Sequence, residues 1–422
     1  MKLGKIIDEE NRLVALYLAA KKGGKKVTLP IAALLFMAIG LHFIFASHAA
    51  TPSLSAQPEN GTMSGSAVAV NDSAASGGKA VQFAGVTPTP SPTPSPTPTP
   101  PPPTSCTGPT VNVTGTTSSK YTNANPASGT TFNNKGWFSN FVSGPGSSEA
   151  YDVGMGNVPP SICVVGGVVD GHISPSLAWQ YVHDSIGGFG YRVGTSGLEQ
   201  ILNVRVHDVE DGIKPRECAT TKDSCPTTYT NKGNMLISGA YMTDIRDDSI
   251  EDDDFLAGTI KDSLFDGVWT FLSEQQQGSV TGPGVGSGES PYIFITNDYI
   301  RLYTTNTPET GGGKWFKWQG STSHHIPVIT DSVFAVDKMP RSGWSSLSIP
   351  SGTQWKGTNY ILWLGTPGGY GGPKPAGVTF LEGQAALDKW NAVRNPWLAA
   401  HGYAQKAPTD LNPADDPVVA PQ

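Results

Sequence analysis

The sequence has little charge and no basic excess. Charged residues make up 15% of its 422 residues, and Asp and Glu outnumber Lys and Arg by 35 to 28. Because phosphate binding needs a basic surface, the net charge of −7 predicts no nucleic-acid partner. Helical periodicity is also scarce outside the two ends of the chain. With 50 Gly and 35 Pro in its place, the composition favours an all-β body with many turns.

Long apolar runs are lacking too, with one exception at residues 27–46. A run of about 20 residues matches the length of a helix that spans a bilayer. Four lysines within 21–26 precede it, so we expect 1–26 to stay in the cytoplasm and the rest to be exported. The small residues at 47–49 offer a cleavage point, so a transmembrane anchor and a signal peptide are both open. The protein is then either membrane-anchored facing outside the cytoplasm, or secreted.

Cysteine is scarce, with four residues at Cys106, Cys163, Cys218 and Cys225. In an exported protein an even number predicts two disulfides, and three pairings are open. We expect Cys218 to pair with Cys225 across a short polar loop, and Cys106 to pair with Cys163. A zinc site is the alternative, which the wide spacing between Cys218 and Cys225 disfavours.

Composition divides the rest of the chain. Residues 47–105 are first rich in Ala, Ser and Gly and then in alternating Pro and Thr, which predicts a disordered segment and a polyproline II rod. That rod either spaces the body from the membrane or links modules. We interpret 106–160 as an N-terminal cap over the first open strand edge. Apolar spacing predicts a helical cap at 384–405, broken or kinked at Pro396, and 406–422 is a loose, disordered tail.

A short phrase repeats in the middle of the chain. Asp211-Gly212-Ile213 recurs as Asp248-Ser249-Ile250 and again as Asp266-Gly267-Val268, each time after an alternating run. A unit this short cannot bury its own apolar face, so it must stack on copies of itself. We expect the apolar residues of the three phrases to form one buried column.

With these features the chain resembles the right-handed parallel β-helix superfamily of pectate lyases and polygalacturonases. The resemblance rests on the repeated phrase, on the alternation, and on Asn203, Asn297 and Asp331 opening strands. It implies an all-β, right-handed parallel β-helix over 161–383. The pair Asp247-Asp248 fits a phrase of the polygalacturonase-like hydrolases, whereas their Gly-His-Gly and Arg-Ile-Lys phrases are absent.

The residues that follow each repeated phrase are expected to lie together on an outer face of the stacked turns. Equivalent positions of successive turns stack at about 4.8 Å, so basic, acidic and aromatic side chains should lie together. We assign catalysis to Glu251, Asp253, Lys214 and Arg216. Substrate binding is assigned to Trp269, Phe271 and Arg246. Such a face suits a sugar, and the alternative is a solvated face with ordinary salt bridges.

The stretch 244–254 is unusually acidic. Crowded carboxylates repel each other unless a cation or a shared proton offsets them, and calcium is the natural cation. We assign Asp247, Asp252 and Asp254 to a calcium site. Two alternatives stay open: a carboxylate pair for glycosidic cleavage, and a structural ladder in which the phrase aspartates cap turn amides.

The run 314–318, Lys-Trp-Phe-Lys-Trp, is followed by His324 and His325. Exposed Trp and Lys suit carbohydrate or cell-surface binding, and simple packing on the body is the alternative. Adjacent histidines on a strand point to opposite faces, so we do not expect both to bind one metal. We therefore predict an exported protein that acts on or binds polysaccharide or a cell-envelope glycan, as a lyase or a glycoside hydrolase. The alternative is a non-catalytic structural or carbohydrate-binding protein of the cell surface.

Overall fold

The computed structural model describes residues 67–71, 79–83, 107–141, 149–154, 161–173, 187–192, 197–216, 234–275, 290–303, 313–320, 323–340, 342–415 and 418. The chain divides into two units, residues 1–96 and 97–422. In the first unit, β1 (Ala67–Asn71) and β2 (Lys79–Phe83) pair as antiparallel strands. The prediction that the whole of 47–86 is disordered is therefore wrong for these two strands.

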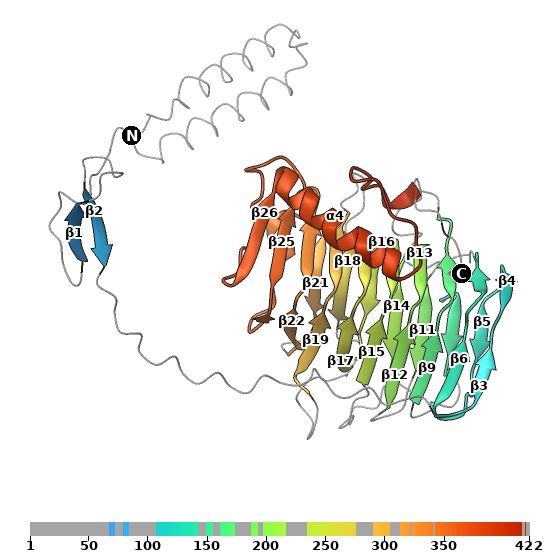
Figure 1. The fold of residues 1–422 in the computed structure, drawn as a ribbon. Helices are drawn as coiled ribbons and strands as arrows, with labels where there is room; N and C mark the ends of the chain where they lie inside the picture. The colour runs from blue at the N-terminus through green and yellow to red at the C-terminus, as the bar shows by residue number, and fades with distance from the viewer. Residues whose placement is uncertain are drawn as a thin grey trace, which may run out of the picture. The chain divides into compact units, whose positions relative to one another are not determined.

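The second unit consists of parallel strands stacked in two large sheets (Figure 1). The nine-stranded sheet contains β3 (Thr110–Asn112), β6 (Thr130–Asn133), β9 (Ser161–Val165), β12 (Leu198–Leu202), β15 (Asn234–Ser238), β17 (Ala257–Lys261), β19 (Tyr292–Thr296), β22 (Ile326–Thr330) and β24 (Gln354–Lys356). The main path of the other sheet contains β4 (Gly115–Thr117), β7 (Trp137–Ser139), β10 (Val168–Asp170), β13 (Arg205–Val209), β16 (Tyr241–Glu251), β18 (Leu264–Gln275), β20 (Tyr299–Leu302), β23 (Val333–Val336), β25 (Asn359–Trp363) and β26 (Val378–Glu382).

A third row of strands extends the second sheet. It contains β5 (Tyr121–Asn123), β8 (Tyr151–Val153), β11 (Phe189–Arg192), β14 (Ile213–Arg216), the distal halves of β16 and β18, and β21 (Lys314–Gln319). The chain thus runs through one strand of each row before it repeats, as in β12, β13 and β14. Stacked parallel sheets of this kind are what a parallel β-helix or solenoid requires, and they agree with the fold predicted from the repeats.

Seven successive turns between the first two rows, from β9–β10 to β24–β25, each contain a residue in the left-handed conformation. These residues have φ between 50° and 74° and are Gly166, Asn203, Gly239, Asp262, Asn297, Asp331 and Gly357. Gly, Asn and Asp tolerate this conformation best, which explains the type of residue found there. Asn203, Asn297 and Asp331 were expected to open strands, and they instead form the tight turn before one.

We expect Gly239→Ala to destabilise the body by about 1–3 kcal/mol, because it adds strain at φ +67° and a Cβ 2.2 Å from Oδ1 of Asn203. Gly136→Ala is the matched control, since Gly136 has φ +80° and no atom within 4 Å of an added Cβ. Urea denaturation should show the larger loss for Gly239→Ala. Equal losses would show that backbone strain alone, and not the contact with Asn203, sets the effect.

The predicted single column is wrong for one of its three members. Ile213 stacks on Ile250, and Ile250 stacks on Leu272, whereas Val268 stacks on Ile245. The difference arises because β16 and β18 pair with an offset of 23 residues at Ile245 and Val268, whereas the repeated phrases are 18 residues apart. The three phrase residues are still fully buried, so the inward direction was predicted correctly.

The two ends of the body differ from the predicted caps. Strands within 110–153 pair in parallel with the same sheets, so this segment adds turns to the stack. The C-terminal helix α4 (Gly383–Ala400) continues through Pro396. Its Trp390 and Trp397 pack with Tyr241, Leu264, Val333 and Leu362 of successive strands. The helix therefore lies across a sheet face and does not close the end of the stack (Figure 1).

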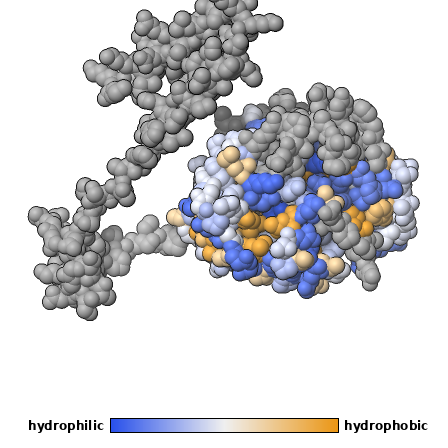
Figure 2. Space-filling model, turned by 90° about the horizontal axis from the view of Figure 1, so that it is seen from above, coloured by the Kyte–Doolittle hydropathy of each residue, from blue (hydrophilic) through white to orange (hydrophobic). Residues whose placement is uncertain are grey.

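The surface of the second unit is mixed. Figure 2 shows hydrophobic residues on one face that are bordered by hydrophilic ones. Within the described ranges, Met339 is the large hydrophobic side chain that stands out as exposed, at 56%. Two short 3₁₀ helices, η2 (Trp344–Leu347) and η3 (Pro413–Asp415), follow late in the chain.

Several predictions concern residues outside the described ranges. These are the apolar run 27–46 and the cysteines Cys106, Cys218 and Cys225. Cys163 is disulfide-bonded, and its pairing with Cys106 stays a prediction. In the described part of the chain, no helix has the length and apolarity needed to cross a bilayer.

Candidate functional site

The third row of strands brings charged residues of successive turns together. Outward-facing Lys214 on β14 lies beside Glu251 at the end of β16, and Ser273 on β18 pairs with Lys317 on β21. Because strands of neighbouring turns stack closely, residues more than a hundred positions apart share one surface. This column forms the centre of the candidate site.

Two lysines hold the carboxylates of this site. Nζ of Lys214 lies 2.5 Å from Oδ2 of Asp211 and 2.6 Å from Oε2 of Glu251. Nζ of Lys317 lies 2.7 Å from Oδ2 of Asp248 and 3.3 Å from Oδ1 of Asp247. The lysines thus supply positive charge that the sequence analysis expected from calcium.

A backbone hydrogen bond joins the two halves of the cluster. The N–H of Asp248 donates to Oδ1 of Asp211 at 3.1 Å. The ladder interpretation is therefore correct for Asp211. It is wrong for Asp266, whose carboxylate instead pairs with Arg301.

The cluster shifts the pKa values of two neighbouring carboxyl groups in opposite directions. Burial, and then the charge of Asp247, raise the pKa of Asp248 well above its ordinary value. Burial also acts to raise the pKa of Asp211, but Lys214 outweighs it and holds that pKa below its ordinary value. Of the two groups, Asp248 therefore holds its proton to the higher pH.

A cavity of about 220 Å³ opens beside Lys317. Strand β21 contributes Lys314, Phe316, Lys317, Trp318 and Gln319 to its lining, and the segment after β23 contributes Ser345, Ser346, Ser348 and Pro350. Two aromatic residues, two lysines and three serines thus line this cavity. The run 314–318 was predicted as a binding candidate, and its contact with the acidic cluster comes from the fold.

Both predicted aromatic binding residues lie in the interior. Trp269 is 3% exposed and Phe271 is 0% exposed, and Phe271 packs against Phe265, Phe316 and Phe334 in the core. The shifted pairing of β18 aligns Glu251 with Ser273 and not with Trp269. The predicted outer column of Lys214, Glu251 and Trp269 is therefore wrong in its third member.

Three other predicted residues make contacts that hold the body together. Nη2 of Arg216 lies 3.4 Å from Oε1 of Glu149. Asp253 accepts a hydrogen bond from the backbone N–H of Gln275 at 3.1 Å. Arg246 is buried, donates to the carbonyl of Ile173 at 2.9 Å, and lies 3.1 Å from Oδ1 of Asp208.

The partner of Arg246 makes a prediction on pH possible. Burial raises the pKa of Asp208 to about 7, with Arg246 opposing and Asp244 adding to the rise. A raised carboxyl pKa means that the folded state holds the proton more tightly than the unfolded state. Stability from this group therefore falls as the pH rises from about 4 to 7. Asp208→Asn should remove this contribution, so the urea midpoint of the variant should change less with pH between about 4 and 7. A variant with the same pH slope as the parent would contradict the prediction.

The predicted calcium ligands do not meet in one place. Oxygen atoms of Asp247 lie within 4.8 Å of those of Glu210 and Asp211, whereas Asp252 groups with Glu274 and His325. Asp254 belongs to neither group. The chain turns a corner after β16, and this corner separates residues that are close in sequence.

The two adjacent histidines approach one carboxylate. Nδ1 of His325 lies 2.6 Å from Oε1 of Glu274, and Nδ1 of His324 lies 3.4 Å from Oε2 of the same residue. Both precede β22 in irregular backbone. The expected opposite orientation, which holds for a strand, is therefore wrong here.

Comparison with known proteins adds no relative. A scan of protein-family models, a search of curated protein sequences and a search of solved structures each gave no match.

Proposed function

We propose that this chain is a glycoside hydrolase that cleaves an acidic polysaccharide at the cluster around Asp248. The observation that carries the proposal is that Lys317, which lines the cavity, contacts Asp247 and Asp248 of a carboxyl cluster in which the pKa of Asp248 is raised and that of Asp211 is lowered. Glycosidic cleavage needs a carboxylic acid to protonate the leaving oxygen and a carboxylate to activate water or attack the sugar. Asp248 has the first role, and Asp211 or Asp247 has the second.

A lyase is the less favoured enzyme. Elimination needs a basic group that can accept a proton, and Lys214 and Arg216 are the cations assigned to catalysis. Burial acts to lower the pKa of Lys214, but Asp211 and neighbouring carboxylates outweigh it and raise that pKa. Arg216 is tied to Glu149. Both cations therefore stabilise carboxylates and are poor proton acceptors.

The charge of the cavity selects the substrate class. Lys314 and Lys317 give the lining positive charge, and Trp318 is an aromatic residue of a type that stacks on sugars. The serines of the lining are of a type that suits sugar hydroxyls. A glycan that contains carboxylated sugars fits this combination better than a neutral one.

The finer assignments of the sequence analysis are part of the same proposal. They are a right-handed helix of the pectate lyase-like superfamily, export, and attachment to the membrane through 27–46. Substrate at the cell envelope would then be reached by a body held out on the Pro/Thr segment. Calcium at Glu210, Asp211 and Asp247 would compete with Lys214 and Lys317, which already contact that cluster.

The test is a screen of acidic and neutral polysaccharides with the purified full-length chain, with calcium and with a chelator. We expect new reducing ends from an acidic polysaccharide, without absorbance from unsaturated products. Unsaturated products would instead show a lyase. Binding without any cleavage would favour the non-catalytic carbohydrate-binding alternative and overturn the enzyme proposal.

A further inference from the structure

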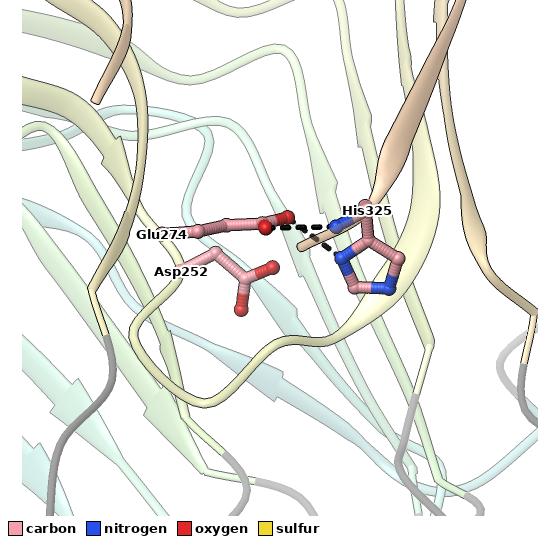
Figure 3. A group of neighbouring side chains, drawn as sticks. All are labelled: Asp252, Glu274 and His325. Atoms are coloured by element: carbon pink, nitrogen blue, oxygen red, sulfur yellow. Dashed lines mark hydrogen bonds and ion pairs between the residues drawn. The ribbon is translucent and has the colours of Figure 1, made fainter. Parts of the chain in front are cut away.

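A second group of side chains lies where three successive turns meet. Asp252 follows β16, Glu274 lies near the end of β18, and His325 precedes β22 (Figure 3). Each offers a ligand atom, and these atoms all lie within 4.8 Å of one another. We propose that this group binds one divalent transition-metal ion, such as Zn²⁺, that joins the three turns. The inference is independent of the proposed hydrolase activity.

Burial makes the charge of this group costly. Asp252 and Glu274 are 0% exposed, and His325 is 1% exposed. Buried carboxylates need positive charge close by, because desolvation of an ionised group costs several kcal/mol. The ion pairs that the structure shows for Glu274 are made with His324 and His325. A neutral imidazole ring supplies no net positive charge.

The geometry of His325 argues for an ion. Its Nδ1 and its backbone N–H both approach Glu274, at 2.6 Å and 3.0 Å. A divalent ion at Nδ1 would bring two positive charges to the two buried carboxylates, whereas a protonated imidazole ring brings only one.

The donor set indicates the class of ion. One imidazole nitrogen and carboxylate oxygens suit zinc and its neighbours, whereas calcium and magnesium prefer oxygen alone. Nδ1 of His324 lies 3.4 Å from Glu274, so it is within reach as a fourth ligand. Trp318 stacks on the His324 ring, with centroids 5.7 Å apart, and orients it. Asp252 is oriented by the backbone N–H of Leu256, which donates to its Oδ1 at 2.8 Å.

The test uses the full-length chain, purified without a histidine tag and treated with a chelator. Titration with Zn²⁺ is expected to saturate at one ion per chain and to raise Tm by at least about 3 °C at a hundredfold excess over Kd. Titration with Co²⁺ should give visible absorbance typical of mixed nitrogen and oxygen ligands. Ca²⁺ should do neither.

Variants locate the site. Asp252→Asn keeps the side-chain volume, and the amide of His325→Asn can still donate a hydrogen bond to Glu274. Each removes a good ligand and should weaken Zn²⁺ binding at least about tenfold. His401→Asn on the last turn beyond α4 is the matched control and should bind like the parent. The far-ultraviolet circular dichroism of each variant reports folding. If a variant does not fold, the Co²⁺ absorbance of the parent still decides between nitrogen-containing and oxygen-only ligands.

Three results would overturn the proposal. The first is no Zn²⁺ or Co²⁺ binding by the parent. The second is a Co²⁺ spectrum of oxygen ligands alone. The third is binding that is lost in Asp247→Asn but kept in Asp252→Asn, which would place the ion in the other carboxylate group. A protein that binds Zn²⁺ but does not cleave glycan would contradict the proposed function and would not affect this inference.

Discussion

Replacing Asp266 by asparagine is expected to lower the free energy of unfolding by about 3–5 kcal/mol, the usual loss when one partner of a buried ion pair is removed. Asp266 is fully buried and faces three cations. Its Oδ1 lies 2.5 Å from Nε of Arg301, and its Oδ2 lies 3.2 Å from Nζ of Lys406 and 3.6 Å from Nη1 of Arg394. Without the carboxylate, these buried cations lose their central partner.

The effect should depend on pH in a defined direction. Burial acts to raise the pKa of Asp266, but Arg301, Lys406 and Arg394 outweigh it and hold that pKa well below its ordinary value. A depressed carboxyl pKa stabilises the fold above the unfolded-state pKa of about 3.9, and this stabilisation is lost as the pH falls below it. The difference between parent and variant should therefore be full at pH 7 and shrink below about pH 4.

The control is Asp262→Asn, four residues earlier. Asp262 has a side chain that is 54% exposed and pairs with His401 at 3.3 Å, so its loss should stay within about 0.5 kcal/mol. Asparagine also tolerates the left-handed conformation of this position. Urea denaturation of both variants is the measurement. A loss below 1 kcal/mol in Asp266→Asn would show that the cations are satisfied without the carboxylate.

Replacing Asp248 by asparagine is expected to reduce turnover of the substrate found in the screen by about 10²–10⁴-fold, the usual contribution of a general acid. An amide has the shape of the protonated carboxyl group but cannot give up a proton at a useful rate. Because burial favours the neutral form of Asp248, the variant should unfold near the parent's Tm. Initial rates of reducing-end formation, measured at saturating substrate, check this.

A pH profile separates a catalytic role from a structural one. The parent should lose activity at high pH, as Asp248 gives up its proton, and at low pH, as Asp211 becomes protonated. The residual activity of Asp248→Asn should lack the high-pH limb. Asp388→Asn, on the exposed face of α4, should keep the parent's rate and profile. Unchanged turnover in Asp248→Asn would show that another residue is the general acid.

Local pattern predicted the fold better than the site. Turn residues such as Asn203 and Asn297, and the alternation around them, indicated stacked parallel strands, because a repeated short unit has few other ways to bury its apolar face. The inward direction of Ile213 and Ile250 followed from alternation alone. These features depend on neighbours one or two residues away, which a sequence displays directly.

The strand register between neighbouring turns could not be predicted from the sequence. Strands β16 and β18 pair with an offset of 23 residues and then 22, and not with the 18 that separates Ile250 from Val268, so Val268 lies beside Ile245 and Ser273 beside Glu251. An insertion or bulge changes every later alignment in a strand, and its position depends on the packing of the next turn. The predicted aromatic surface failed for this reason.

The sequence by itself determined that this chain stacks parallel strands, turns them at Gly, Asn and Asp, and concentrates carboxylates near residue 250. Tertiary structure alone decided which cations meet those carboxylates. Lys317 reaches Asp247 and Asp248 from about 70 positions away, and Arg394 and Lys406 reach Asp266 from the C-terminal segment. The physical reason is that a charge is neutralised by whatever lies within a few ångströms, and stacked turns set that distance without regard to separation along the chain.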